Sequence, residues 1–298
     1  MTKEITITLS DGSQKQAESG RTGWKMEDGR WKMGVGKIIK PAKESKTAPR
    51  NPPRDELNIL LEHYQNRRYD QAELLAMQIT QKFPEHQYGW KILGALFGQK
   101  GMKIEAFNAT QKAVQLAPQD STVHSNLGNA LRELGRLEEA EVSYRHAIKL
   151  QSDFAEAHYH LGTLLQELGR LDEAKVIFRQ AILLKPDFPA AHNSLGITLK
   201  ELGRPVDAEA SYRKAIAIKA DFAEAHNNLG NILKELHRLP EAEKYFREAI
   251  HLRKNYKPAL AGLGALLMRK GNHKEGLKNL RLGNGAIYFN SKKGVVIL

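Results

Sequence analysis

The middle of the chain repeats itself at a fixed interval. The segments that begin at His124, His158, His192 and His226 align with one another over their whole length, and each begins about 34 residues after the one before. A chain built from equal units of this length folds as a row of similar units, each of which buries its apolar face against its neighbours. The repeat therefore predicts a solenoid with a ribbon of core, not a domain around one central core.

Each unit has the pattern of two helices. His124, Leu127 and Leu131 are spaced by three and four residues, which places them on one face of a first helix. Gly135 follows where this helix must end, because glycine adopts the left-handed conformation that closes many helices without steric cost. A second apolar stripe begins at Leu137. We therefore expect a helix-turn-helix in every unit.

Small residues recur as regularly as large ones. They are Gly128, Gly162, Gly196 and Gly230 in the first helices, and Ala140, Ala147, Ala174, Ala181, Ala208, Ala215, Ala242 and Ala249 in the second helices. Small side chains let two helix backbones approach closely, so the two helices of a unit are expected to pack as a hairpin. One hairpin cannot bury its apolar stripe alone, and stacking on its neighbours does so.

The pattern Leu-Gly-x-x-Leu, Gly, Ala, Tyr/Phe, Ala resembles the tetratricopeptide repeat family, of the bacterial type. The proline that usually ends the unit is present at Pro84, Pro118 and Pro186. The resemblance covers about three quarters of the chain. It implies an all-α fold, a right-handed α/α superhelix whose first helices line a concave groove that binds peptides or protein segments.

The repeats divide the sequence into three parts. The predicted solenoid covers residues 53–283, between an arm at 1–52 and a tail at 284–298. Its expected units are 53–86, 87–120, 121–154, 155–188, 189–222, 223–256 and a degenerate 257–283. The first unit is also degenerate, because Leu60 and Arg67 stand where glycine is expected.

The arm at residues 1–52 is basic. Ile5–Leu9 alternates like a strand, and Trp-Lys-Met occurs at Trp24 and again at Trp31, which predicts a small hairpin. A Lys/Pro-rich linker follows over Lys37–Arg54. Eleven Lys/Arg against six Asp/Glu give the arm +5 of the formal net charge of +12. Two interpretations stay open, a flexible solvated tail and a surface for nucleic acid or an acidic partner.

The tail differs from both other parts. Ala286–Phe289 and Val295–Leu298 have the pattern of two short strands, which predicts a hairpin-like end. This segment resembles the one that joins bacterial tetratricopeptide arrays to catalytic domains such as sulfotransferases or oxygenases. We expect no such domain in this chain.

No pattern of catalytic or metal-binding residues matches the repeat in strength. The absence of cysteine excludes disulfides and thiolate zinc sites, and neither HExxH nor Gly-x-Ser-x-Gly occurs. The four aligned histidines lie one repeat apart, too far to share a metal ion, and are expected to pack. No signal peptide and no apolar run that could span a bilayer are evident. We therefore expect a cytoplasmic protein that is not an enzyme and has no metal or cofactor.

Two local interactions are expected on the surface of the repeats. Asp153 with Glu156, and Asp221 with Glu224, have the spacing of capping boxes at the starts of first helices. A glutamate precedes an arginine by three residues near the end of each first helix, which favours pairing between them. These glutamates are Glu133, Glu167, Glu201 and Glu235, and the arginines are Arg136, Arg170, Arg204 and Arg238.

Polar side chains occupy the positions of the first helices that the resemblance places on the concave side. The candidate peptide-binding residues are Asn126, Asn129, Arg132, Asn193, Lys200, Asn227, Asn228, Asn231 and Lys234. The asparagine amide carries two donors and an acceptor, which matches an extended peptide backbone. The run resembles the asparagine ladder in the repeat arm of O-GlcNAc transferases. The alternative is a solvated residue copied with the repeat. Asn129 and Asn231 are expected to have no part in helix packing.

The sequence therefore predicts a non-catalytic scaffold that holds an extended protein segment in its groove. The positive net charge favours a net-acidic partner. Two alternatives stay open. The repeats are the substrate-recruiting arm of a glycosyltransferase- or sulfotransferase-type system whose catalytic domain is absent from this sequence, or the basic arm makes the protein a nucleic-acid-associated adaptor. No interaction with a membrane is expected.

Overall fold

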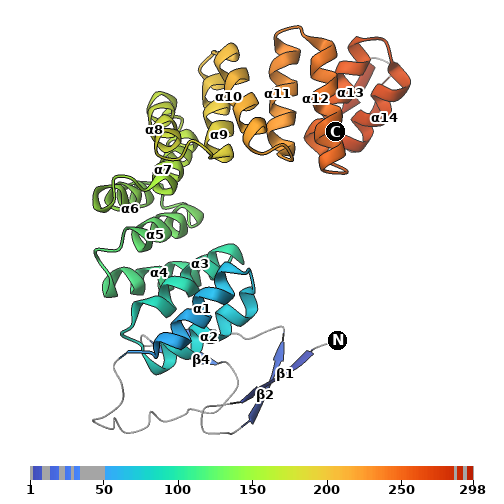
Figure 1. Cartoon of the computed structure of the whole chain (residues 1–298). Coiled ribbons are helices and arrows are strands. Elements are labelled where there is room, and N and C mark those ends of the chain that lie inside the picture. The colour runs from blue at the N-terminus through green and yellow to red at the C-terminus, as the bar shows by residue number, and fades with distance from the viewer. Residues whose placement is uncertain are drawn as a thin grey trace, which may run out of the picture. The chain divides into compact units, whose positions relative to one another are not determined.

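The fold confirms the predicted all-α solenoid with short β-segments at its ends (Figure 1). The computed structural model describes residues 3–8, 14–19, 24–27, 30–33, 51–284, 287–290 and 294–297. Two units divide the chain, Met1–Pro49 and Arg50–Leu298. All the helices of the described residues belong to the second unit.

The helices follow one another in pairs along the second unit. The first helices are α1 (Arg54–Gln65), α3 (Gln87–Gln99), α5 (Ser121–Glu133), α7 (Ala155–Glu167), α9 (Pro189–Glu201), α11 (Ala223–Glu235) and α13 (Lys257–Arg269). The second helices are α2 (Tyr69–Lys82), α4 (Lys103–Leu116), α6 (Leu137–Leu150), α8 (Leu171–Leu184), α10 (Pro205–Ile218), α12 (Leu239–Leu252) and α14 (His273–Asn284).

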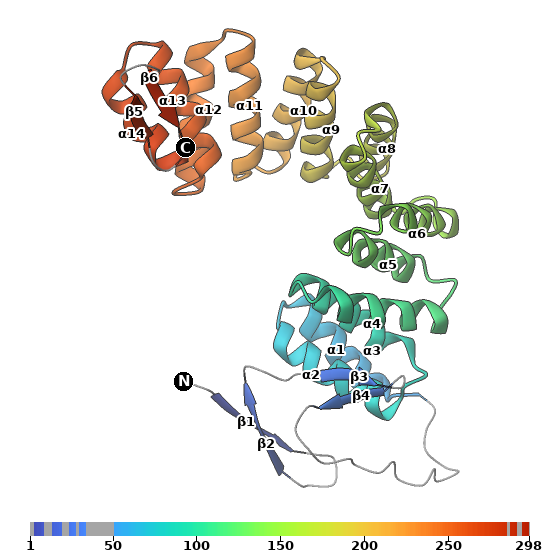
Figure 2. The ribbon, with the colours of Figure 1, turned by 180° about the vertical axis from the view of Figure 1, so that it is seen from behind.

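First and second helices lie on different sides of the array (Figures 1 and 2). Each second helix packs on its own first helix and, from α2 to α12, on the first helix of the next pair. From α3 to α13, each first helix also contacts the next first helix directly. We call the side formed by the first helices the inner side and the side formed by the second helices the outer side.

The turn within each pair contains a residue with left-handed backbone. Gly135, Gly169 and Gly203 have φ angles of 76°, 72° and 70°, as the sequence predicted. Arg67 and His237 occupy the equivalent place with φ angles of 57° and 59°. A side chain with a Cβ atom is strained in this conformation, so these two turns are less favourable than the glycine turns.

In the four central repeats, an aromatic ring of the second helix packs against the backbone of the first helix at a glycine. A Cβ atom on Gly128 would lie 2.5 Å from the ring of Tyr144, and one on Gly162 would lie 2.8 Å from the ring of Phe178. The same contact joins Gly196 to Tyr212 and Gly230 to Phe246. The four rings are at most 1% exposed and form the ribbon of core with the recurring alanines. Even alanine is therefore too large for these glycine positions.

The last pair has glycine, at Gly276 and Gly283, where the five pairs before it have alanine. A Cβ atom on Gly283 would lie 2.5 Å from the backbone nitrogen of Ala261, and one on Gly276 would lie 3.0 Å from Met268. Helices α13 and α14 therefore approach each other too closely for a methyl group at position 283. The departure from the repeat pattern reflects close packing.

Short antiparallel hairpins lie at both ends of the chain. In the first unit, β1 (Lys3–Thr8) pairs with β2 (Gln14–Ser19), and β3 (Trp24–Glu27) pairs with β4 (Arg30–Met33). Trp24 is opposite Met33 and Met26 is opposite Trp31, which confirms the predicted Trp-Lys-Met hairpin. After α14, β5 (Ile287–Asn290) pairs with β6 (Gly294–Ile297), as predicted for the tail. Most of the predicted linker, residues 37–54, lies outside the described residues.

The predicted capping boxes are wrong. Phe154 and Phe222 occupy the N-cap positions of α7 and α11, and neither helix has a side-chain cap. The helices begin one residue later than expected, so Asp153 and Asp221 lie one position too early to accept from the free backbone N–H groups. A side-chain cap does occur at α5, where Asp120 accepts from a backbone N–H of the first turn at 2.9 Å.

The predicted pairing between a glutamate and the arginine three residues later is also wrong. Arg136 instead pairs forward with Glu139 at 2.6 Å, on the first turn of α6. Arg170, Arg204 and Arg238 pair in the same way with Glu173, Asp207 and Glu241. The left-handed turn at Gly135 separates Glu133 from Arg136, because it reverses the chain between the two residues. Arg136 therefore lies at the start of the second helix and pairs with a residue of that helix.

Candidate functional site

The four aligned histidines bind the turns between repeats. Nε2 of His124, His158, His192 and His226 lies 2.8–3.0 Å from a backbone carbonyl oxygen six residues earlier. Trp90 donates its indole N–H to the equivalent carbonyl at 2.8 Å. In residues 51–284 and the described strands, no group of three or more His, Asp or Glu side chains is arranged to hold a metal ion. The aligned position therefore fixes the geometry of the turn between repeats.

Asparagines of α9 and α11 bind one another across the boundary between two repeats. Nδ2 of Asn228 donates to Oδ1 of Asn193 at 3.1 Å, and Nδ2 of Asn227 donates to Oδ1 of Asn228 at 3.4 Å. Asn193 and Asn227 are buried, with 8% and 5% of their surface exposed. Oδ1 of Asn227 has no hydrogen-bond partner in the part of the chain that the structure describes. The three amides form one continuous polar strip between neighbouring first helices.

The other asparagines of the predicted set differ in their surroundings. Oδ1 of Asn129 accepts a 2.7 Å hydrogen bond from the hydroxyl of Tyr144, so the expectation that Asn129 has no part in packing is wrong. Oδ1 of Asn231 accepts from Nζ of Lys234 at 3.3 Å. The side chain of Asn126 is half-buried, and none of the described residues forms a hydrogen bond with it.

Two rings of α7 lie between the asparagines of α5 and those of α9. The imidazole of His160 stacks on the ring of Tyr144, with 5.9 Å between centroids and 19° between planes, and Tyr159 packs beside it. Burial, reinforced by the charge of Arg132 and opposed by Glu156, lowers the pKa of His160 to about 4. The imidazole is therefore neutral near neutral pH, and Tyr159 and His160 present two uncharged rings on α7.

Two of the three predicted cations form ion pairs between successive first helices. Arg132 of α5 lies 3.6 Å from Glu167 of α7, and Lys200 of α9 lies 3.3 Å from Glu235 of α11. Lys234 has no carboxylate within ion-pair distance among the described residues. The positive charge of Lys234 is therefore the least neutralised of the three.

The ammonium group of Lys234 is half-buried and lies 5.9 Å from the centre of the Phe246 ring. Burial lowers the pKa of Lys234, Glu235 opposes this, and the positive charges of Lys200 and Arg269 lower the pKa further. An anion bound beside Lys234 would relieve this repulsion. The electrostatics of the inner side near α9, α11 and α13 therefore favour a negatively charged ligand.

Arg269 is part of this surface, although the sequence analysis missed it. It ends α13 at the place where four earlier first helices carry a glutamate. Those residues are Glu133, Glu167, Glu201 and Glu235. The change from glutamate in four successive repeats to arginine in the next was the signal that could have identified Arg269.

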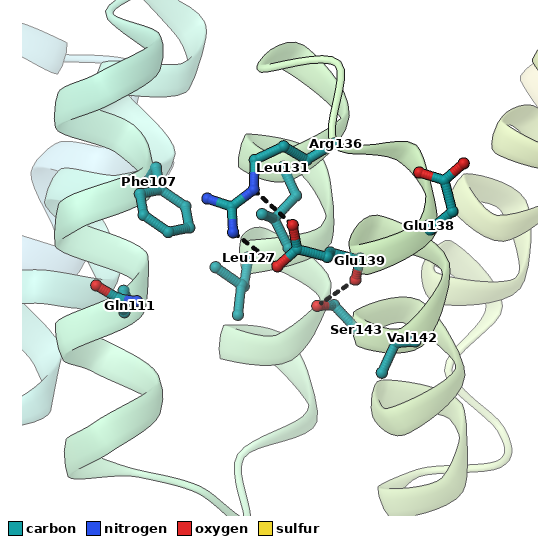
Figure 3. Close-up of a pocket in the computed structure, with 9 residues that line it drawn as sticks. All are labelled: Phe107, Gln111, Leu127, Leu131, Arg136, Glu138, Glu139, Val142 and Ser143. Atoms are coloured by element: carbon teal, nitrogen blue, oxygen red, sulfur yellow. Dashed lines mark hydrogen bonds and ion pairs between the residues drawn. The ribbon is translucent and has the colours of Figure 1, made fainter.

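A shallow hollow lies on the outer side between α4, α5 and α6 (Figure 3). Phe107, Leu127 and Leu131 line it, and Figure 3 shows the guanidinium of Arg136 between the ring of Phe107 and the carboxylate of Glu139. The guanidinium carbon is 4.8 Å from the ring centre, and two hydrogen bonds of 2.6 and 2.7 Å join Arg136 to Glu139. Because Arg136 already has these partners, the hollow offers no free cation to a ligand.

None of the helices in the described residues is long and apolar enough to cross a bilayer.

Comparison with solved structures supports the fold. The chain is similar to the structure of the APC/C hetero-tetramer Cut9–Hcn1, with a TM-score of 0.67 and 16% identity over 75% of this chain. The chain spans only 44% of that chain's length. It is also similar to pilF of Pseudomonas aeruginosa, with a TM-score of 0.62 and 18% identity over 67% of this chain and 93% of the other. These two similarities concern the fold.

A third similar structure is YrrB, described as a TPR protein with an unusual peptide-binding site. Its TM-score is 0.50 and its identity 25%, over 60% of this chain and 92% of YrrB. No curated protein matches the chain.

Comparison with protein-family models identifies the repeats themselves. A model described as TPR repeat matches residues 128–169, and models described as tetratricopeptide repeat match 155–188, 189–222 and 223–256. The matched residues agree with the helix pairs from α5 to α12. This chain therefore contains tetratricopeptide repeats.

Proposed function

We propose that the inner side of the array, from α5 to α13, is a non-catalytic scaffold that binds an extended, net-acidic protein segment. The observation that carries the proposal is the amide strip of Asn193, Asn227 and Asn228, next to a half-buried Lys234 without a carboxylate partner among the described residues. Proteins with tetratricopeptide repeats generally mediate interactions between proteins. The description of YrrB as a peptide-binding protein and the resemblance to the repeat arm of O-GlcNAc transferases support the same assignment.

Asparagine amides suit this ligand because an extended segment exposes one N–H and one C=O at each residue. In the proposal, Asn126, Asn129, Asn228 and Asn231 contact the segment directly. Each such hydrogen bond contributes roughly 0.5–1.5 kcal/mol net, so several asparagines must bind the segment together to give measurable affinity. The buried Asn193 belongs to the same site, because it holds the amide of Asn228 in place.

Cations at the ends of the first helices supply the preference for acidic segments. Lys200 and Arg269 each repel Lys234 electrostatically, so a carboxylate near Lys234 lowers this repulsion. Arg132 would act in the same way near α5, beside the ion pair that it forms with Glu167. Asn227 lies at the base of the strip, where it supports Asn228.

The proposal is tested with three unstructured peptides of equal length, one rich in glutamate, one uncharged and one rich in lysine. We expect the glutamate-rich peptide to bind most tightly and the lysine-rich peptide least, as measured by titration calorimetry. Lys234→Gln should weaken binding of the glutamate-rich peptide by roughly fivefold, which corresponds to about 1 kcal/mol. Asn228→Ala should weaken the glutamate-rich and the uncharged peptide alike, because it removes hydrogen bonds to the backbone.

Lys214 provides a matched control, because it is an exposed lysine on α10, on the outer side. Lys214→Gln removes the same charge as Lys234→Gln and should leave binding unchanged. If both variants lost the same affinity for the glutamate-rich peptide, the loss would come from the net charge of the protein. That result would overturn the inner-side assignment. Equal affinity for all three peptides would overturn the preference for acidic segments.

A further inference from the structure

The outer side carries a charged cluster at each of several boundaries between repeats. Between α6 and α8, the carboxylate of Glu141 accepts from Arg145 at 2.8 Å and from Arg170 at 2.6 Å. Arg170 also binds Glu173 of its own helix. Partial burial alone would raise the pKa of Glu141, but the hydrogen bonds from both arginines outweigh it and the pKa is lowered. The cluster contains two carboxylates and two guanidinium groups, so its net charge is zero.

Two later boundaries repeat this arrangement. Between α10 and α12, Glu209 accepts from Arg213 at 2.9 Å and from Arg238 at 2.8 Å. Between α12 and α14, the residues are Glu243, Arg247, Lys270 and Glu275, and the contacts are 2.6–3.0 Å. In all three clusters, one carboxylate from the earlier helix lies between two cations. The central carboxylates are 13–19% exposed, so each fills a partly buried position.

The boundary between α8 and α10 lacks this central carboxylate. Lys175 stands where the other clusters have Glu141, Glu209 or Glu243. Lys175 binds Asp172 at 2.5 Å, and Arg204 binds Asp207 at 2.6 Å.

Two donor groups at this boundary remain without partners. The NH1 group of Arg204 has no acceptor within the described residues, although the equivalent group of Arg170 binds Glu141. Arg179, the equivalent of Arg145, forms no hydrogen bond or ion pair there either. Asp172 balances Lys175 and Asp207 balances Arg204, so Arg179 leaves this boundary with a charge of +1, where the clusters described above carry zero.

The boundary between α4 and α6 shows that a missing carboxylate can be replaced. Phe107 stands at the central position there, and its ring receives the guanidinium of Arg136 at 4.8 Å (Figure 3). At the boundary between α8 and α10, the central position is a lysine, which cannot accept from a guanidinium. The charge of Arg179 therefore has no carboxylate partner among the described residues.

We propose that the outer side at the boundary of α8 and α10 binds a carboxylate side chain of an acidic protein partner. The carboxylate takes the place that Glu141 and Glu209 occupy at the neighbouring boundaries and accepts from Arg179 and Arg204. Guanidinium pairs bind carboxylates with directional, charge-assisted hydrogen bonds. The contact is separate from the inner side and gives the array a second point of attachment.

The probe for this site is an N-acetylated, C-amidated tetraglutamate, titrated into the full chain. The readout is the NMR signal of the arginine Nε–H groups, which reports each guanidinium separately. We expect saturable shifts at Arg179 and Arg204 and none at Arg170 and Arg238, whose carboxylates are internal. Equal shifts at all four arginines, or no shift at Arg179 and Arg204, would overturn the proposal. Because the readout is local, binding of the probe on the inner side does not affect the outcome.

Lys175→Glu tests the same idea from within the protein. The new carboxylate should take the central position, remove the shifts at Arg179 and Arg204, and raise the melting temperature. Lys214→Glu changes the net charge equally outside the cluster and should leave the shifts intact. Arg179→Gln, at an exposed position, should weaken the probe's binding at Arg204 roughly tenfold even if Lys175→Glu does not fold. Shifts that persist in a folded Lys175→Glu variant would contradict the assignment.

Discussion

The hydroxyl of Tyr144 donates a 2.7 Å hydrogen bond to Oδ1 of Asn129, and this bond joins the core of a repeat to its inner side. The ring of Tyr144 is fully buried against Gly128, while Asn129 is the next residue along α5. Packing of α6 on α5 therefore sets the orientation of a residue that we assign to ligand binding. A substitution in the core of this repeat changes the candidate site as well as stability.

Tyr144→Phe should lower the free energy of unfolding by about 0.5–1.5 kcal/mol, because the ring remains and only the interactions of the hydroxyl with Asn129 and Arg132 are lost. Tyr212 provides the matched control. It packs on Gly196 in the same way, but its hydroxyl has no hydrogen-bond partner among the described residues. Tyr212→Phe should therefore lower the free energy of unfolding by less than Tyr144→Phe does. Urea unfolding of both variants measures the difference, and equal costs would mean that the bond to Asn129 contributes nothing.

Two glycine-to-alanine substitutions should have opposite effects. Gly98 is exposed in α3, and a Cβ atom there would meet nothing within 4 Å, so Gly98→Ala should raise the free energy of unfolding by about 0.5–1 kcal/mol. On Gly162 the Cβ atom would meet the ring of Phe178 at 2.8 Å, so Gly162→Ala should lower it by about 1–3 kcal/mol. Changes of the same sign in urea unfolding would show that the Gly162 contact relaxes freely.

The left-handed turn at His237 should be improved by glycine. His237 has a φ angle of 59° in a turn where five other repeats have glycine with φ angles of 70–81°. His237→Gly should raise the melting temperature, by an amount that corresponds to about 1 kcal/mol.

Gly169→Ala provides the reverse change for that turn. A Cβ atom on Gly169 would meet no other atom within 4 Å, so only the backbone conformation penalises alanine. Gly169→Ala should lower the free energy of unfolding by about 1 kcal/mol. A stabilised Gly169→Ala, or a destabilised His237→Gly, would contradict the role assigned to the left-handed residue.

His160 should make stability fall in weak acid. Its pKa is lowered from 6.5 to about 4 in the folded protein, so the unfolded chain binds the proton more readily. The contribution of His160 to stability is therefore complete above pH 6.5 and is lost as the pH falls toward 4. The loss should be roughly 3 kcal/mol. His160→Gln should flatten the curve of unfolding free energy against pH in this window, and curves that run parallel for both proteins would contradict the burial of the imidazole.

The helices and the turns between them were predictable because the same local sequence pattern recurs in several repeats. A single glycine at position 135 is weak evidence for a turn, but its recurrence at 169 and 203 is strong evidence, and all three have positive φ angles. In the four central repeats, the glycine of the first helix and the aromatic residue of the second helix recur with the same regularity. Their contact follows from the hairpin that the spacing predicts.

Interactions that depend on one residue of register were not predictable. The capping boxes failed because α7 and α11 begin one residue later than the pattern suggested. Arg136 pairs with Glu139 because the turn places it on the second helix, which sequence spacing alone does not reveal. The bond between Tyr144 and Asn129 joins two helices, so neither helix alone indicates it.

The contacts of α7 and α8 with the rest of the array come chiefly from the pairs immediately before and after them. Such a pair behaves as a removable module, since nothing at a distance depends on its presence. A chain without residues 155–188 would join α6 directly to α9 and bring Glu141 and Arg145 opposite Arg204 and Asp207. The shortened array would then have a neutral boundary at this place, made entirely from residues that the chain already contains.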